Sequence, residues 1–205
     1  SGQVFASVGN STVNVYDPSS GNLLNSLVDN TNEPYTVGTA FNSQGDLFVA
    51  DDLNGDISEF GPDGTALPTF ATGLSNPISM VFDNQGNMYV GQQTTPYIAE
   101  FAPDGTRLAD IGPLQTELYG DDWIDLSSDE CTFYYTSEGT DIFTYNKCTN
   151  TQGPTFNKVP FPSVDSSTGL SVNAFQLKIL ENGDVLVADS NAILEFDANG
   201  NLIQT

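Results

Sequence analysis

Short runs of apolar and β-branched residues recur along the chain, each separated from the next by Gly, Asn or Asp. The segment Phe41–Val49 is echoed by Phe82–Val90, and Glu59–Thr65 is echoed by Glu100–Thr106. Both pairs are offset by 41 residues, a repeat length typical of solenoids and propellers. No run has the 3.6-residue period of an amphipathic helix, so the repeats predict short strands joined by turns.

Each full repeat holds four such runs, which is the strand content of one β-propeller blade. The predicted strands of two successive repeats lie at 37–41, 46–51, 56–60 and 65–71, then at 78–82, 87–92, 97–101 and 106–111. Those of the last two lie at 122–126, 131–137, 142–147 and 155–160, then at 175–180, 184–189, 192–196 and 201–205. The sequence therefore predicts an all-β fold, a β-propeller with five visible four-stranded blades at about 1–30, 35–72, 76–112, 121–160 and 173–205.

The first blade is predicted to lack its innermost strand. By alignment with the later repeats, Val4–Val8, Thr12–Tyr16 and Leu23–Leu27 are strands two, three and four. A sheet edge left in this state exposes apolar surface and unpaired backbone groups. Three interpretations remain open. Residues 1–205 are a five-bladed ring with one three-stranded blade, a part of a larger propeller, or a ring or filament that a neighbouring copy closes. The expected partner is another copy of the chain or further sequence that completes blade one.

The charge balance excludes several kinds of partner and of chemistry. Acidic residues number 27 and basic residues 4, for a net charge of −23, and such a surface repels nucleic acid and anionic membranes. The chain has no histidine, which excludes Ser-His-Asp and Cys-His catalysis and histidine-ligated metal centres. No apolar run reaches 18 residues, so no transmembrane helix is predicted.

The only two cysteines are predicted to form a disulfide. The dipeptide Gly139-Thr140 is typical of a two-residue type II′ hairpin turn, and that turn would place Cys131 directly opposite Cys148. Directly opposed cysteines on one face of a hairpin lie within disulfide distance. A disulfide indicates an oxidising compartment, so we expect a secreted or cell-surface protein.

Several segments are similar to known propellers. The runs Leu47–Asp52 and Val185–Ser190, and more specifically Asp122–Gly139 and Tyr145–Gln152, resemble the NHL-like β-propellers of secreted bacterial proteins. The resemblance covers nearly the whole chain and implies an extracellular binding scaffold. Members of that group usually extend further, which favours the larger propeller or the assembly. The wider superfamily also implies lyases and lactonases, and its lyases depend on histidine.

A set of acidic residues is predicted to share one rim of the propeller, because all lie at turns that open on the same face. These residues are Asp51, Asp52, Asp56, Asp121, Asp122, Glu138 and Asp189. One interpretation is a weak calcium site, calcium being the one cofactor that the chain suggests. The other is that Asn54-Gly55 forms a type I′ hairpin turn whose backbone the Asp side chains cap.

Two opposite charges are predicted to meet near the propeller axis. When the inner strands are aligned on their last apolar residue, Asp125 and Lys178 occupy the same position in adjacent blades. An unpaired buried charge is costly, so we expect a structural ion pair. Separately, Asn10-Ser11-Thr12 fits the sequon for N-glycosylation at Asn10.

The predicted function is that of an extracellular, non-enzymatic propeller that binds a partner or assembles with itself. The alternative is a calcium-dependent lactonase or hydrolase of the regucalcin and gluconolactonase type. Such enzymes hold calcium near the axis, and the predicted inner strands carry mostly apolar or small residues rather than an inward Glu.

Overall fold

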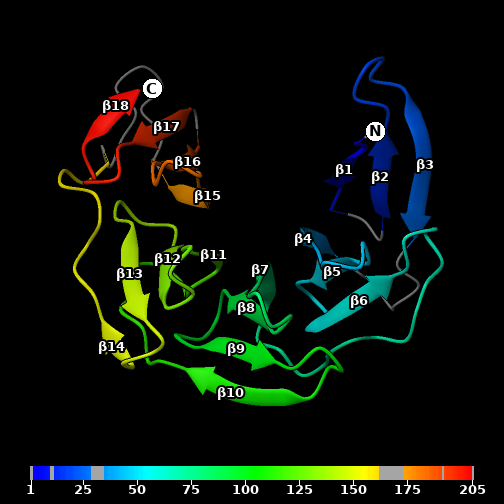
Figure 1. The fold of residues 1–205 in the computed structure, drawn as a ribbon, viewed down its shortest axis with the longest axis horizontal. Coiled ribbons are helices and arrows are strands. Elements are labelled where there is room, and N and C mark those ends of the chain that lie inside the picture. Colours follow the sequence, from blue (N-terminus) through cyan, green and yellow to red (C-terminus); the bar gives the residue numbers. More distant parts are fainter. Residues whose placement is uncertain (1, 10–11, 29–34, 162–172, 191, 205) are drawn as a thin grey trace.

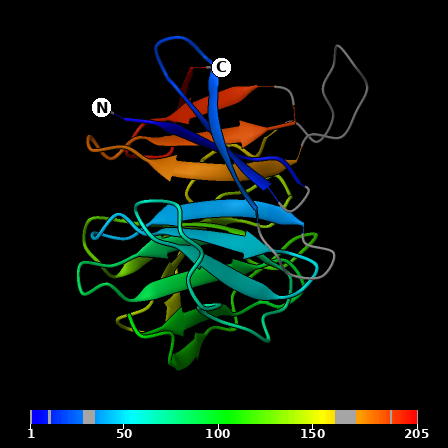
Figure 2. The same cartoon turned by 90° about the vertical axis from the view of Figure 1, so that its right-hand side faces the viewer.

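Five antiparallel sheets stand side by side around an open ring (Figure 1). The computed structural model describes residues 2–9, 12–28, 35–161, 173–190 and 192–204. These residues form 18 strands and no helix, and so contain no helix that could cross a membrane. The all-β propeller predicted from the 41-residue repeat is confirmed, and Figure 2 shows the same open ring from the side of blades one and two.

The strands follow the chain order, blade by blade. Blade one holds β1 (Val4–Ser7), β2 (Thr12–Tyr16) and β3 (Leu23–Val28), and blade two holds β4 (Thr36–Phe41), β5 (Leu47–Asp51) and β6 (Asp56–Phe60). Blade three holds β7 (Pro77–Phe82), β8 (Met88–Gln92), β9 (Ile98–Phe101) and β10 (Arg107–Ile111). Blade four holds β11 (Trp123–Leu126), β12 (Thr132–Thr136), β13 (Phe143–Asn146) and β14 (Thr151–Gln152). Blade five holds β15 (Ala174–Ile179), β16 (Val185–Asp189), β17 (Ile193–Phe196) and β18 (Leu202–Gln204).

Two predicted outer strands differ from the structure, and both segments contain proline. In blade two, the run 65–71 is not a regular strand: it joins β6 through isolated bridges at Ala66 and Ala71, and Pro68 between them has no N–H for a regular ladder. In blade four, the prediction of a strand at 155–160 is wrong. The outer strand there is the two-residue β14, which is followed by Gly153 and Pro154, and the predicted segment itself contains Pro160.

Blade one has three strands, and ring contacts identify the missing position. Phe5 on β1 packs against Phe41, the last residue of β4, with ring centroids 4.9 Å apart. In the same way Phe48 on β5 packs against Phe82, the last residue of β7, at 5.2 Å. Because β5 is the second strand of its blade, β1 is also a second strand. Among the described residues, no strand pairs with its inner edge.

The apolar core lies between neighbouring blades. Four clusters of buried side chains separate the five blades, one at each contact between neighbours. Successive side chains of a strand point to opposite faces, so each blade contributes to two clusters. On β5, for example, Val49 packs toward blade one and Ala50 toward blade three. Blades one and five each have one face that no described blade covers.

The disulfide between Cys131 and Cys148 is confirmed, with Cα atoms 5.3 Å apart. The two-residue turn at Gly139-Thr140, from which this pairing was predicted, is wrong. Six residues, 137–142, connect β12 to β13, and Phe133 lies opposite Tyr145. The register therefore places Cys131 opposite Lys147, whose N–H donates to the Cys131 carbonyl at 2.8 Å. The disulfide therefore joins residues just beyond the paired strands. The presence of a disulfide indicates an oxidising, extracellular environment.

Candidate functional site

Part of the predicted acidic rim consists of turn caps. The buried Asp51 carboxylate accepts hydrogen bonds from the N–H groups of Tyr35 at 3.0 Å and Asn54 at 3.2 Å. Asp189 accepts one from the N–H of Ala192 at 2.7 Å. Four residues separate β5 from β6, and within them only Gly55 has a positive φ, of 71°. The predicted type I′ turn is therefore wrong, because that turn needs two positive φ angles.

The other rim residues come from several blades: Asp122 lies near Asp121 and Glu138, whereas Asp52 and Asp56 belong to blade two. Asp56 lies opposite Asp51 on the paired strands β5 and β6, and the Asp52 carbonyl accepts a hydrogen bond from Asn76 of blade three. Within the described ranges, no three Asp, Glu, Cys or His side chains form a group that could hold a metal ion. The possible glycosylation site at Asn10 lies outside the described residues.

Asp121 and Asp122, which precede β11, form the most unusual part of the rim. Both residues are fully buried, and the two carboxylate oxygens of Asp121 have no hydrogen-bond partner, whereas the Asp122 carboxyl lies beside the carboxyl of Glu138. Burial, followed by the charge of Glu138 nearby, raises the pKa of Asp122 to about 8. Burial, with a smaller contribution from Asp122, also raises the pKa of Asp121 well above its usual value. At neutral pH Asp122 is therefore mostly protonated.

The backbone around these carboxyls is held by blade three. The Ser79 hydroxyl on β7 donates to the Asp122 carbonyl at 2.5 Å and accepts from the Ile124 N–H at 3.0 Å. On β8, a Cβ at Gly91 would lie 2.4 Å from the Asp121 carbonyl oxygen, so only glycine fits there. Sequence analysis did not identify Ser79 or Gly91, because neither belongs to a recognisable motif.

Asp125 and Lys178 meet between blades four and five. The Lys178 Nζ lies 2.9 Å from the Asp125 carboxylate, which also accepts hydrogen bonds from the N–H groups of Ile179 at 2.8 Å and Leu126 at 3.0 Å. The Asp125 side chain is 5% exposed and the Lys178 side chain 66% exposed. The carboxylate is thus the buried member, and its bond to the Ile179 backbone ties blade four to blade five.

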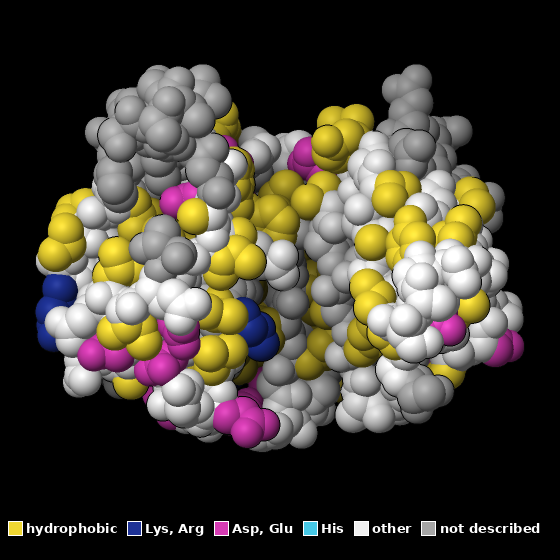
Figure 3. Space-filling model, turned by 90° about the horizontal axis from the view of Figure 1, so that it is seen from above, with side chains coloured by type: hydrophobic (Ala, Val, Ile, Leu, Met, Phe, Trp, Pro, Cys, Tyr) yellow, Lys and Arg dark blue, Asp and Glu magenta, His cyan; other side chains and the backbone are white. Residues whose placement is uncertain are grey.

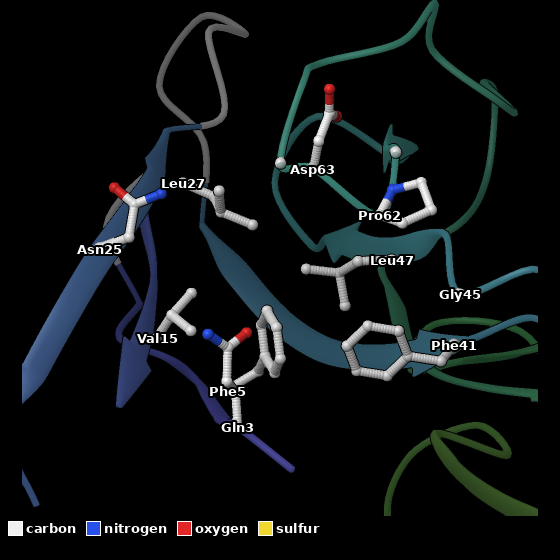
Figure 4. A pocket seen from close by; sticks show the side chains of 12 residues that line it. Gln3, Phe5, Val15, Asn25, Leu27, Phe41, Gly45, Leu47, Pro62 and Asp63 are labelled. Atoms are coloured by element: carbon white, nitrogen blue, oxygen red, sulfur yellow. The ribbon is translucent and has the colours of Figure 1, made fainter. Parts of the chain in front are cut away.

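Hollows lie between blades at the end opposite the acidic rim. One of about 200 Å³ separates blades one and two, with Phe5, Phe41 and Leu47 around it (Figure 4). A second, of about 630 Å³, lies between blades two and three over Phe48 and Phe82. In the following interface Tyr89 occupies the position of Phe48, and Lys147 donates to its hydroxyl at 2.7 Å. The two hollows therefore occupy equivalent positions in successive blade interfaces.

The inner edge of β1 is a second candidate site. The Val8 N–H donates to the Thr12 carbonyl at 3.2 Å, which sets the alternation of the β1–β2 ladder. Ala6 then directs its backbone groups toward β2, whereas Phe5 and Ser7 direct theirs to the opposite edge. No described strand covers that edge. β1 consequently presents backbone donors and acceptors of the kind that an added strand would pair with.

The fold defines the class of protein: a β-propeller whose first blade has three strands in the described part of the chain. No protein-family model and no curated protein matches the chain. Several solved structures match the chain. A gluconolactonase from Xanthomonas campestris matches with a TM-score of 0.70 and 18% identity, covering 98% of this chain and 70% of that one.

Two lyases match over the full chain. A streptogramin B lyase has a TM-score of 0.68 and 16% identity, and the virginiamycin B lyase from Staphylococcus aureus has 0.66 and 14%. This chain spans 65% and 66% of their lengths, just under two thirds. At such identities the likeness shows the β-propeller fold and not the activity.

Proposed function

We propose that the protein is an extracellular, non-enzymatic assembly module whose open propeller joins to another copy of the same chain. One observation carries the proposal: the inner edge of β1 has no described strand beside it, although the described inner strands β4, β7, β11 and β15 line the other four blades. A strand added there would supply backbone hydrogen bonds and apolar cover together. The disulfide supports an extracellular site of action, and the absence of histidine leaves few routes to catalysis.

A proline placed at the β1 edge tests this proposal. Ser7→Pro removes an N–H that points to the free edge and leaves the β1–β2 ladder intact. We expect this variant to raise the protein concentration at which half of the chains are assembled by about tenfold or more, because one backbone hydrogen bond is lost and the ring obstructs the approaching strand. Light scattering combined with gel filtration measures the assembled fraction directly.

Ser26→Pro is the matched control. Ser26 lies on β3, opposite Asn14, and by the same alternation its N–H points to the outer, solvent-facing edge of blade one. This variant should assemble as the unaltered protein does. Equal assembly of the Ser7→Pro and unaltered proteins, or a single copy of the unaltered chain at every concentration, would contradict the proposed function.

A calcium-dependent hydrolase is the second candidate function. The observation that favours it is the pair of buried carboxyls at Asp121 and Asp122, because the Asp121 oxygens have no hydrogen-bond partner. Carboxylate oxygens are the ligands that calcium prefers, and a bound cation would satisfy them. Support for this candidate is weaker, since no third acidic, Cys or His side chain of the described chain completes a metal-binding group with them.

A further inference from the structure

The uncovered face of blade five carries residues similar to those that blade two buries against its next neighbour. On β16 and β17, Val185, Val187, Leu194 and Phe196 pack toward blade four. Because side chains alternate along a strand, Leu186, Ala188, Ile193 and Glu195 point the opposite way. They form two cross-strand pairs, Leu186 with Glu195 and Ala188 with Ile193. We call these four residues the blade-five face.

Blade two has two equivalent pairs, and all of their residues except the half-buried Glu59 are buried. There Phe48 lies opposite Glu59 and Ala50 lies opposite Ile57, and this face packs on blade three. The two blades differ most in the exposure of the isoleucine on this face. Ile57 and its counterpart Ile98 in blade three are both 0% exposed, whereas Ile193 is 64% exposed. The blade-five face therefore has the composition of an interface between blades but, in the described chain, no blade beside it.

The uncovered face of blade one carries the complementary pattern. On this face Val4 lies opposite Tyr16, and Ala6 lies opposite Asn14. The corresponding pairs that blade three presents to blade two are Met88 with Phe101 and Val90 with Ala99, all of them buried. Each has an aliphatic residue opposite an aromatic one, followed by a pair of smaller residues. Val4 is 49% exposed. We call Val4, Ala6, Asn14 and Tyr16 the blade-one face.

The two faces flank the opening of the ring. Figure 1 places blade one and blade five on either side of it, and Figure 3, which looks into it, shows apolar side chains on both walls. We infer that the blade-five face of one copy packs against the blade-one face of a second copy, as blade two packs against blade three within the chain. This inference rests on the proposed function and adds the surface through which the copies meet.

Such a contact joins unlike surfaces, so copies add head to tail. A heterologous contact of this kind produces a closed ring or an open filament rather than a symmetric dimer. The net charge of −23 opposes the approach of copies at low ionic strength. Salt screens this repulsion, and we therefore expect assembly to strengthen as salt is added.

Ile193→Glu tests the contact. The substitution leaves the single chain folded because Ile193 is exposed, but it buries a charge if a second blade covers the face. It should raise the concentration for half-assembly by about tenfold or more. Leu108→Glu is the control, since Leu108 is 52% exposed on the outer strand of blade three, away from the opening. This control should assemble as the unaltered chain does.

Cross-linking then identifies the two faces. A chain carrying Ile193→Cys is mixed with a chain carrying Val4→Cys, and a short thiol-reactive cross-linker should join one of each; a mixture of Leu108→Cys with Val4→Cys should remain unlinked. If the protein assembles but Ile193→Glu behaves as Leu108→Glu does, or the thiols at 193 and 4 do not link, this contact is wrong and the proposed function still stands. A chain that remains single at every concentration overturns both.

Discussion

Replacing Asp122 by Asn is expected to reduce the pH dependence of the free energy of unfolding by about 1.4 kcal/mol per pH unit between about pH 4 and pH 8. The pKa of Asp122 is about 8 in the folded chain, and an unfolded Asp has a pKa of about 3.9. Between these values the folded protein holds a proton that the unfolded chain has released. Stability therefore falls as the pH rises, and the Asn variant lacks this contribution.

Urea unfolding at a series of pH values measures this slope. Asp104→Asn is the control: hydrogen bonds from Thr106 lower the pKa of the exposed Asp104, so its carboxylate is charged throughout the range. Equal slopes for the unaltered and Asp122→Asn proteins would show that the buried carboxyl does not titrate as described. The same series with calcium chloride tests the hydrolase candidate. A calcium ion held by Asp122 would remove the slope from the unaltered protein.

Asp125→Ala is expected to lower the free energy of unfolding by about 4 kcal/mol, whereas Lys178→Ala should cost less than about 1 kcal/mol. The buried carboxylate accepts from two backbone N–H groups, and its loss leaves the Ile179 N–H without that acceptor at the contact between blades four and five. The lysine is 66% exposed, so water replaces the ammonium contact at little cost.

Urea unfolding followed by the fluorescence of Trp123, the single tryptophan, measures both costs close to the pair. Trp123 lies at the start of β11, the strand that carries Asp125. Leu108→Ala, on an exposed outer strand, provides the reference for a surface truncation. Equal losses for Asp125→Ala and Lys178→Ala would contradict the account, since they would mean that the ion pair rather than the backbone bond joins the blades.

The strands were predictable wherever a strand is half-buried and has no proline in its interior. In blades three and five the predicted and observed strands agree to within a residue or two, because most turns are marked by Gly or Asn and each strand by apolar residues. The outer segments around Pro68 and Pro154 were not predictable from the same pattern. The repeat predicts a strand in both segments, but Pro68 has no N–H for the ladder in blade two, and in blade four the outer strand is only Thr151–Gln152.

The candidate site was predictable only in part. The pairing of Asp125 with Lys178 follows from aligned inner strands, because the residues occupy equivalent positions in adjacent blades. The exposure of Lys178 could not be predicted from the sequence, because it depends on the direction in which the long side chain extends from the strand. Likewise the sequence places Asp121 and Asp122 on a rim, but it does not predict their complete burial or the close approach of Gly91 to their backbone carbonyls.

Amide hydrogen exchange at Phe5 and Ser7 tests the central claim most directly, because their N–H groups point to the open edge of β1. The exchange rates are followed by NMR over a range of protein concentrations, with the Ala6 amide, which is directed toward β2, as the internal reference. The account predicts fast exchange at Phe5 and Ser7 in dilute protein and slowed exchange as copies assemble, while Ala6 exchanges slowly throughout. Fast exchange at Phe5 and Ser7 at every concentration would contradict assembly through this edge, and slow exchange in the most dilute single chain would show that the edge is already paired.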